Sequence, residues 1–321
     1  MKILPRKLIN NNLLFIDGTA KSGKVVISTI ISSFKNTQNQ VFKWRYNNML
    51  KYSKEKLIDK SLAIDWILQD IQISEIENHI SRYTNFRKHD LSSINNSYYA
   101  KNYKKNLKIK DNDLEINKII QKIKKEKPIY PLVVDDFFPI CLKNANQFLK
   151  YKKIIMLKNP IIQLFDLIKR KRIEKIEANS PWKIDHKIFF NGKVISWNLI
   201  NNTKLKKINN IYDKYLLLLQ NEINNYLNPN ILKFKKTKIV FIEDVWSNPK
   251  KTVVGLEKFL NTKKSLLTNK ILAKLSLPRN KQKIYDNAYK FIQNKLSNNQ
   301  KKIIFELEKK YLYLKNHIDG K

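Results

Sequence analysis

The sequence predicts an α/β fold of three layers, in which helices cover both faces of a mainly parallel central sheet. Short apolar runs typical of buried strands alternate with stretches of helical periodicity along the 321 residues. The first such run, Leu13–Asp17, leads into Gly18, and Gly23 and Lys24 follow in the spacing G-x-x-x-x-G-K. Glycines placed between a strand and a helix let backbone N–H groups face one anion, so this segment predicts a phosphate-binding loop (P-loop).

The remaining elements follow from the same patterns. Strands are expected at 13–17, 132–134, 153–157 and 238–242. Helices are expected at 24–34, in two or three pieces over 47–81, at 113–127, 140–149, from 160, at 204–226 and over most of the remainder to 316. Residues 82–106 are polar and are expected to form a long loop. Asn191 and Gly192, set between alternating apolar residues, predict a small β-hairpin insertion over 187–196.

The chain shows neither an internal repeat nor a clear linker. We therefore expect a single domain over residues 1–321, with extra helices and a helical and loop insertion at about 47–127. In parallel sheets of this kind, ligands bind at the carboxyl ends of the strands. The loop that follows Asp17 is expected at that edge.

The charge of the chain is strongly positive, with 64 Lys and Arg against 27 Asp and Glu. An anionic partner is one interpretation: a nucleic acid, a phosphorylated cofactor, a sulfated glycan or a membrane surface. The other is biased composition, because Lys, Asn and Ile are abundant throughout. With 42% apolar residues, a disordered chain is excluded.

Compartment and membrane signals are few. Cys141 is the only cysteine, so neither an intrachain disulfide nor a thiolate metal cluster is expected. No apolar run reaches the roughly 18 residues of a transmembrane helix, and residues 1–12 lack the apolar segment of a signal peptide. We expect a cytoplasmic protein without a transmembrane segment.

One residue of the loop differs from the pattern of nucleotide hydrolases. The Ser or Thr that would follow Lys24 and hold Mg²⁺ is Val25, which offers no oxygen. The loop is therefore expected to bind a phosphate without this metal ligand.

Three segments together resemble the sulfotransferase family. They are Gly18–Lys24, Pro131–Phe165 and Lys238–Leu260. The second is similar to the family's acidic strand end, helix, strand and R-[ND]-P turn, and the third to its strand with an E-D pair, a downstream N-P and a helix ending in F-L. The resemblance covers about half the chain. It implies a P-loop enzyme that transfers a sulfuryl group from 3′-phosphoadenosine 5′-phosphosulfate (PAPS) to a hydroxyl or amine acceptor without a metal.

The resemblance also implies site residues in the loop. Lys21 occupies the family's basic position, where it would neutralise charge on the transferred group, and Lys24 and Val25 replace a Thr-Thr pair. The implied cofactor-binding residues are Gly18, Thr19, Ala20, Lys21, Ser22, Gly23, Lys24 and Val25.

Two further positions correspond to the family's 3′-phosphate site. Lys158 stands where the family has Arg, which keeps the charge but loses the bidentate fork. Asp166 stands where the family has Ser, and its carboxylate would repel a phosphate.

The acceptor needs a general base. His89, in a polar segment similar to one found in sulfotransferase-like proteins of unassigned substrate, is one candidate, although Asp and Ser hydrogen bonds that shape a loop explain the same segment. Asp135 and Asp136, after the strand at 132–134, are the others.

Two other functions stay open. A P-loop kinase or NTPase using Mg-ATP would use Asp135 or Asp136 as a metal-binding carboxylate at a strand end. A basic nucleic-acid-binding protein without enzymatic activity would explain the charge, although no zinc spacing, helix-turn-helix or RNP pattern is present.

Overall fold

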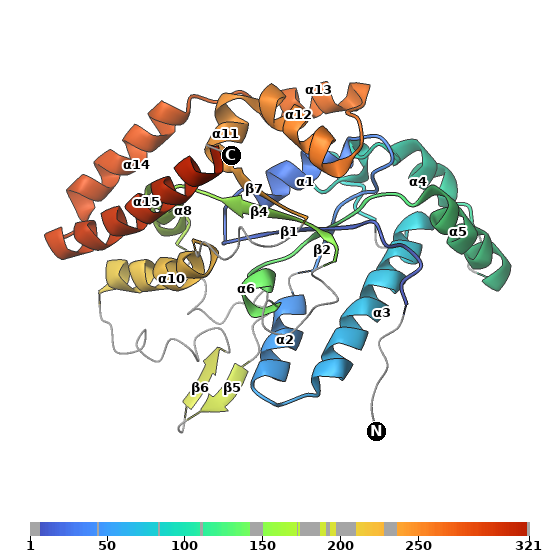
Figure 1. The fold of residues 1–321 in the computed structure, drawn as a ribbon, viewed down its shortest axis with the longest axis horizontal. Coiled ribbons are helices and arrows are strands. Elements are labelled where there is room, and N and C mark those ends of the chain that lie inside the picture. The colour runs from blue at the N-terminus through green and yellow to red at the C-terminus, as the bar shows by residue number, and fades with distance from the viewer. Residues whose placement is uncertain are drawn as a thin grey trace. The chain divides into compact units, whose positions relative to one another are not determined.

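The computed structural model describes residues 7–43, 45–82, 84–109, 112–141, 150–171, 173, 187–190, 193–196, 210–227 and 236–319 (Figure 1). Contacts between residues divide the chain into two compact units. The first comprises Met1–Leu157 and Asn230–Asn280, and the second comprises Lys158–Pro229 and Lys281–Lys321.

A five-stranded parallel sheet forms the centre of the first unit, in the order β2-β3-β1-β4-β7. The strands are β1 (Leu13–Gly18), β2 (Val41–Phe42), β3 (Tyr130–Val133), β4 (Lys152–Leu157) and β7 (Thr237–Phe241). All six residues of β1 are buried, and its first four, Leu13–Ile16, form the continuous apolar run that predicts a central parallel strand. The four predicted strands of this sheet are confirmed, and β2 is an addition.

Ten helical segments of the first unit are described. They are α1 (Lys24–Ser32), α2 (Tyr46–Lys54), α3 (Lys60–His79), the 3₁₀ helix η1 (Ile94–Asn96), α4 (Ala100–Asn106), α5 (Asp113–Glu126), α6 (Phe137–Cys141), α11 (Ile242–Ser247), α12 (Pro249–Leu260) and α13 (Leu266–Lys274). The loop expected over 82–106 was wrong in its second half, where η1 and α4 lie. Helix α6 begins before the expected 140, and residues 142–149 lie outside the described part of the chain.

Helices cover both faces of this sheet. Phe15 of β1 packs in a core with residues of α2, α3 and α6, and its ring stacks on Phe137 at 5.3 Å between centroids. Because side chains alternate along a strand, the neighbouring Leu14 and Ile16 face the opposite side. Helix α1 contacts β1 and β3 but adds no residue to the core around Phe15, so it covers that opposite face. The predicted three-layer α/β architecture is confirmed.

The second unit is built around α8 (Pro160–Lys169). It also contains β5 (Lys187–Phe190), β6 (Lys193–Ser196), α10 (Ile211–Tyr226), α14 (Lys281–Lys295) and α15 (Asn298–Asp319). Helix α8 contacts α10, α14 and α15, and β5 pairs with β6 in an antiparallel hairpin, as predicted. The turn residues 191–192 and the expected helical residues 204–209 lie outside the described residues.

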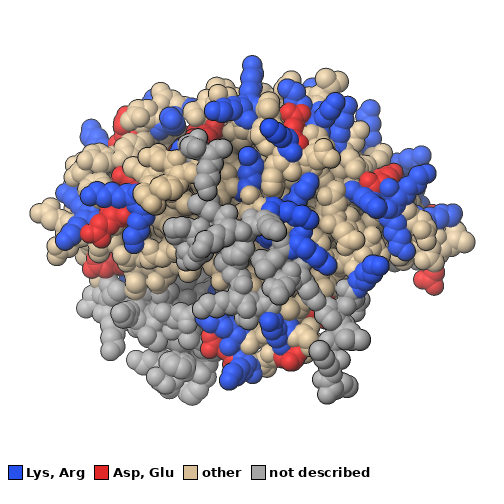
Figure 2. Space-filling view, viewed as in Figure 1, with Lys and Arg blue, Asp and Glu red and all other residues tan. Residues whose placement is uncertain are grey.

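Figure 2 shows Lys and Arg spread over the described elements of the face in view rather than gathered in one patch. None of the helices in the described part of the chain is both long enough and apolar enough to cross a bilayer.

Candidate active site

The loop between β1 and α1 has the backbone that its two glycines predict. Gly18 and Gly23 have φ angles of 144° and 98°, in the region that favours glycine. A Cβ at Gly18 would overlap the carbonyl oxygen of Met156, and one at Gly23 would lie 2.5 Å from Cδ1 of Ile242. The loop therefore packs closely against β4 and α11, and the glycine spacing is a steric requirement of this packing.

The middle of the loop combines an exposed cation with a buried hydroxyl. Lys21 is exposed and adopts φ 64°, an uncommon conformation for a residue with a side chain. Ser22 is buried, and its Oγ has no hydrogen-bond partner among the described residues. A buried hydroxyl without a partner costs about 1–3 kcal/mol. Ser22 therefore has a hydroxyl donor that a bound oxyanion could accept.

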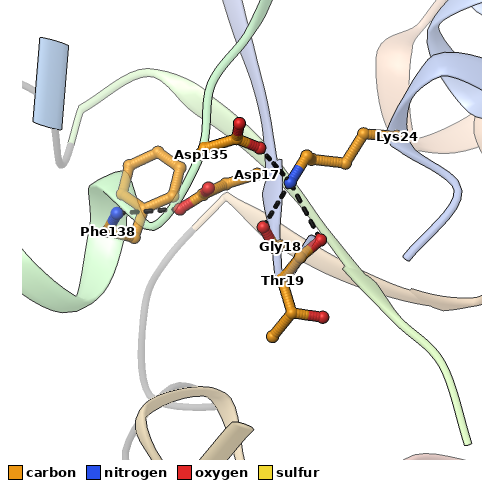
Figure 3. Close-up of polar contacts among 6 residues, drawn as sticks. All are labelled: Asp17, Gly18, Thr19, Lys24, Asp135 and Phe138. Carbon is orange, nitrogen blue, oxygen red and sulfur yellow. Dashed lines mark hydrogen bonds and ion pairs between the residues drawn. The ribbon is translucent and has the colours of Figure 1, made fainter. Parts of the chain in front are cut away.

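Lys24 turns back onto its own loop. Its ammonium donates hydrogen bonds to the carbonyl oxygens of Gly18 and Thr19, the latter at 3.0 Å, and forms an ion pair with Asp135 (Figure 3). The side chain is only 7% exposed. Lys24 thus closes the loop from inside and fastens it to the end of β3.

Asp17, the residue before Gly18, is a site residue that the sequence reasoning missed. It is fully buried, and its Oδ2 accepts a hydrogen bond from the backbone N–H of Phe138 at 2.8 Å. Its Oδ1 has no hydrogen-bond partner among the described residues. An aspartate at the end of a continuous apolar strand, directly before a glycine-rich loop, was the available signal.

Burial and neighbouring charges together set the pKa values of Asp17 and Lys24. Burial raises the pKa of Asp17, although Lys24 and the hydrogen bond from Phe138 act to lower it. For Lys24, burial acts to lower the pKa, but Asp135 and Asp17 outweigh burial and the pKa lies above its ordinary value. Lys24 is therefore a permanent cation whose charge is largely offset inside the protein.

Asp135 is the candidate base that the structure brings to the loop. It follows β3 by two residues, and 51% of its side chain is exposed. Asp136, the next residue, has φ 48° and turns the chain into α6. Asp135 is thus held on one side by Lys24 and is open to solvent on the other.

His89, the other candidate base, lies in an exposed turn. Asn85 Nδ2 donates to Asp90 Oδ2 and Ser92 Oγ, both at 2.9 Å, which shapes the turn. Leu91 O accepts a hydrogen bond from Thr29 Oγ1 at 3.1 Å, which anchors the segment to α1. Hydrogen bonds that shape the loop therefore account for Asn85, Asp90 and Ser92 of this segment. Within the described residues, no polar contact joins His89 to the Gly18–Lys24 loop.

Lys158 and Asp166, the residues assigned to a 3′-phosphate, pair with each other in the second unit. The Lys158 ammonium donates to Asp166 Oδ2 and forms an ion pair with it. Lys158 is buried, whereas Asp166 is partly exposed. Asn159 between them caps α8 by accepting a hydrogen bond from the N–H of Ile161 at 2.9 Å. Asp166 therefore compensates a buried cation, a role that the sequence did not reveal.

Comparisons with known proteins find similarity at the level of structure alone. No family model and no curated protein matches the chain. The chain is similar to the sulfotransferase domain from the Synechococcus PCC 7002 olefin synthase, at 12% identity and a TM-score of 0.43, covering 96% of this chain and 97% of that one. A sulfotransferase domain from the curacin biosynthetic pathway matches at 12% identity and a TM-score of 0.38, covering 83% and 77%. Sulfotransferase STF9 from Mycobacterium avium matches at 9% identity and a TM-score of 0.37, covering 88% of this chain and 76% of that one. The three structures carry the name of the family that the sequence resembles.

Proposed function

We propose that this chain is a sulfotransferase-like enzyme that transfers a sulfuryl group from PAPS to a hydroxyl or amine acceptor without a metal. The observation that carries the proposal is the Gly18–Lys24 loop. It combines a glycine-shaped anion cradle with an aliphatic residue, Val25, where a nucleotide hydrolase has a metal ligand. Its buried lysine is already neutralised by Asp135.

The loop residues fit the 5′ end of such a cofactor. Backbone N–H groups at the start of α1 and the partial positive charge of that helix end favour an anion there. The Ser22 hydroxyl, buried and without a hydrogen-bond partner among the described residues, can donate to an oxyanion. Lys21, exposed beside it, supplies a positive charge. When bound, the cofactor would supply the activated sulfuryl group.

Positioning and charge stabilisation do most of the work in a transfer of this type, by analogy with phosphoryl transfer. We assign Lys21 to stabilising charge on the transferred group, because it is the exposed cation of the loop. We assign Asp135 to accepting the acceptor's proton, because its carboxylate lies beside the loop and is half exposed. Lys24 positions Asp135 through their ion pair. His89 stays a second candidate base.

Lys158 is proposed to contribute charge toward the cofactor's 3′-phosphate, as the family resemblance implies. Its ammonium is paired with Asp166. Binding of a phosphate at Lys158 would therefore compete with this carboxylate.

A kinase or NTPase that uses Mg-ATP is the second candidate. The observation in its favour is the place of Asp135 beside the loop lysine, at the end of β3, which pairs directly with β1. Such a carboxylate at a neighbouring strand end holds Mg²⁺ in P-loop kinases and ATPases. Val25 and the direct pairing of Asp135 with Lys24 speak against it.

Calorimetry separates the two candidates. The purified protein is titrated with 3′-phosphoadenosine 5′-phosphate, and separately with ATP and Mg²⁺. The first ligand should bind without metal, and Lys21→Ala should weaken binding about tenfold or more, equivalent to about 1.4 kcal/mol. Lys101→Ala, at an exposed position of α4, is the matched control and should bind as the wild type does. Tight Mg-ATP binding without any response to the bisphosphate would refute the sulfotransferase proposal.

A further inference from the structure

A pocket of about 210 Å³ lies at the amino ends of the sheet strands, opposite the carboxyl ends where the Gly18–Lys24 loop lies. It opens at the amino ends of β1, β3 and β4, and its polar walls come from Asn12, Asn36, Lys152, Asn261 and Thr262. Ile129 and Leu260 supply its apolar part. None of the residues that line the pocket is acidic. The volume is below the roughly 300–1,000 Å³ of pockets for drug-sized ligands, so it suits a small ligand.

Lys152 places a positive charge in this pocket. Its ammonium donates one hydrogen bond, to the carbonyl oxygen of Leu260 at 2.8 Å, out of the three that an ammonium can donate. Among the described residues, no carboxylate lies within ion-pair distance of Lys152. The ammonium therefore has donors and charge to offer a ligand.

A second lysine adds to the positive potential. Lys236 directly precedes β7, and its ammonium donates to the carbonyl oxygen of Lys150 at 3.2 Å. Burial lowers the pKa of Lys152, and the charge of Lys236 lowers it further. Two cations close enough to repel each other, without a carboxylate between them in the described structure, favour an anion in the adjoining pocket.

The amides of the wall supply neutral donors. Asn12 Nδ2 donates to the carbonyl oxygen of Lys127 at 3.0 Å, and Asn36 Nδ2 donates to that of Glu126 at 3.2 Å. A carboxamide nitrogen has two hydrogens, so each retains one. These bonds also hold both side chains at the pocket. Asn261 ends α12 in the left-handed conformation, with φ 55°, and its N–H donates to the carbonyl oxygen of Glu257.

We propose that this pocket is a binding site for a small tetrahedral oxyanion of the sulfate or phosphate type, held by the ammonium of Lys152 and the amides of Asn12 and Asn36. The anion is either free in solution or the phosphate of a small monoester. The site is separate from the proposed sulfuryl-transfer loop, because the two lie at opposite ends of parallel strands.

The test is calorimetric titration of the full chain, at constant ionic strength, with inorganic sulfate, inorganic phosphate and glycerol phosphate in separate arms. We expect saturable binding of at least one anion and a loss of affinity of about tenfold or more in Lys152→Met. Lys152→Arg, which keeps the charge and a donor, should retain binding. Asn261→Asp places a carboxylate in the wall at a backbone conformation that Asp tolerates, so it should weaken binding even if Lys152→Met folds poorly. Lys101→Met is the matched control.

Three outcomes would overturn the proposal. One is the absence of saturable binding in the wild type. Another is an equal loss of affinity in Lys101→Met and Lys152→Met, which would indicate a response to net charge alone. The third is binding that Lys21→Ala removes and Lys152→Met leaves intact, which would place the anion at the Gly18–Lys24 loop. Binding of the adenosine bisphosphate at that loop is measured separately, so either proposal can fail without the other.

Discussion

Replacing Glu75 by glutamine should stabilise the protein at pH 8 and change its stability much less at pH 5. Glu75 lies on α3 and is 1% exposed. Its Oε1 accepts hydrogen bonds from Asn10 Nδ2 at 2.6 Å and from Gln38 Nε2 at 3.0 Å. Burial raises the pKa of Glu75 from 4.5 to about 7, although both hydrogen bonds act to lower it. The folded protein therefore binds a proton that the unfolded chain releases.

The size of the effect follows from linkage between protonation and folding. Because the folded pKa of Glu75 lies above the unfolded one, the carboxyl favours folding fully below pH 4.5 and progressively less up to about pH 7. Each pKa unit is worth about 1.4 kcal/mol, so the total loss across this window is on the order of 3 kcal/mol. Glutamine does not titrate. The stability gained by Glu75→Gln should therefore grow with pH through this window and level off above it.

A neighbouring histidine makes the comparison with the wild type necessary. Burial lowers the pKa of His79 from 6.5 to about 4, so His79 favours folding fully above pH 6.5 and less as the pH falls toward 4. Between pH 4.5 and 6.5, rising pH therefore lowers the contribution of Glu75 to the free energy of unfolding and raises that of His79. Burial raises the pKa values of Tyr103 and Tyr130 far above ordinary, so neither phenol titrates in this range. Subtracting the pH profile of the wild-type unfolding free energy from that of Glu75→Gln isolates the contribution of Glu75.

The assay is urea unfolding of wild type and Glu75→Gln at pH 5, 6, 7 and 8. Glu55→Gln makes the same charge change at an exposed position and is the matched control. We expect the difference in unfolding free energy between Glu75→Gln and wild type to increase by about 2–3 kcal/mol from pH 5 to pH 8. A difference that is the same at all four pH values would refute it, because the effect would then be one of packing.

Three further substitutions test the candidate site. Gly18→Ala should lower the unfolding free energy by more than about 1 kcal/mol, because a Cβ there would overlap a carbonyl oxygen of β4 and because alanine is strained at the Gly18 φ of 144°. Unchanged urea unfolding would contradict this steric explanation. Asp135→Asn should lower the turnover of sulfuryl transfer about 10²-fold or more, because it removes the proposed base; turnover close to that of the wild type would remove Asp135 from that role. Asp166→Ser should strengthen binding of the bisphosphate severalfold, because it removes the carboxylate that would compete with a phosphate for Lys158, while lowering stability by on the order of 1 kcal/mol; calorimetry showing unchanged affinity would count against a 3′-phosphate at Lys158.

The strands of the sheet were predictable where burial on both faces gives a continuous apolar run, as in Leu13–Ile16. The strand Val41–Phe42 was not, because two residues are too few to show any periodicity. Helix α4 was missed because its sequence is polar apart from Ala100 and Tyr103. That ring is buried against His79, and Asn78 Nδ2 donates to its hydroxyl at 3.2 Å, so tertiary contacts determine the helix.

The candidate site was predictable in its backbone and not in its charge pairs. Two glycines and a lysine at fixed spacing identify a loop of known shape from sequence alone. The partner of Lys24 is Asp135, which is distant in sequence and reaches the loop because β3 pairs with β1. Asp166 similarly looked like an obstacle to a phosphate until the structure paired it with Lys158. Charge signs can be read from a sequence, but pairing requires the fold.

The ion pair between Lys24 and Asp135 has a consequence for the order of events in the proposed reaction. One end of this contact holds the loop that would carry the cofactor, and the other is the carboxylate that would receive the acceptor. Whatever engages Asp135 therefore also alters the hold of Lys24 on the carbonyl oxygens of Gly18 and Thr19. Under the proposed chemistry, cofactor and acceptor would be thermodynamically linked, and each would change the affinity of the other by the same factor.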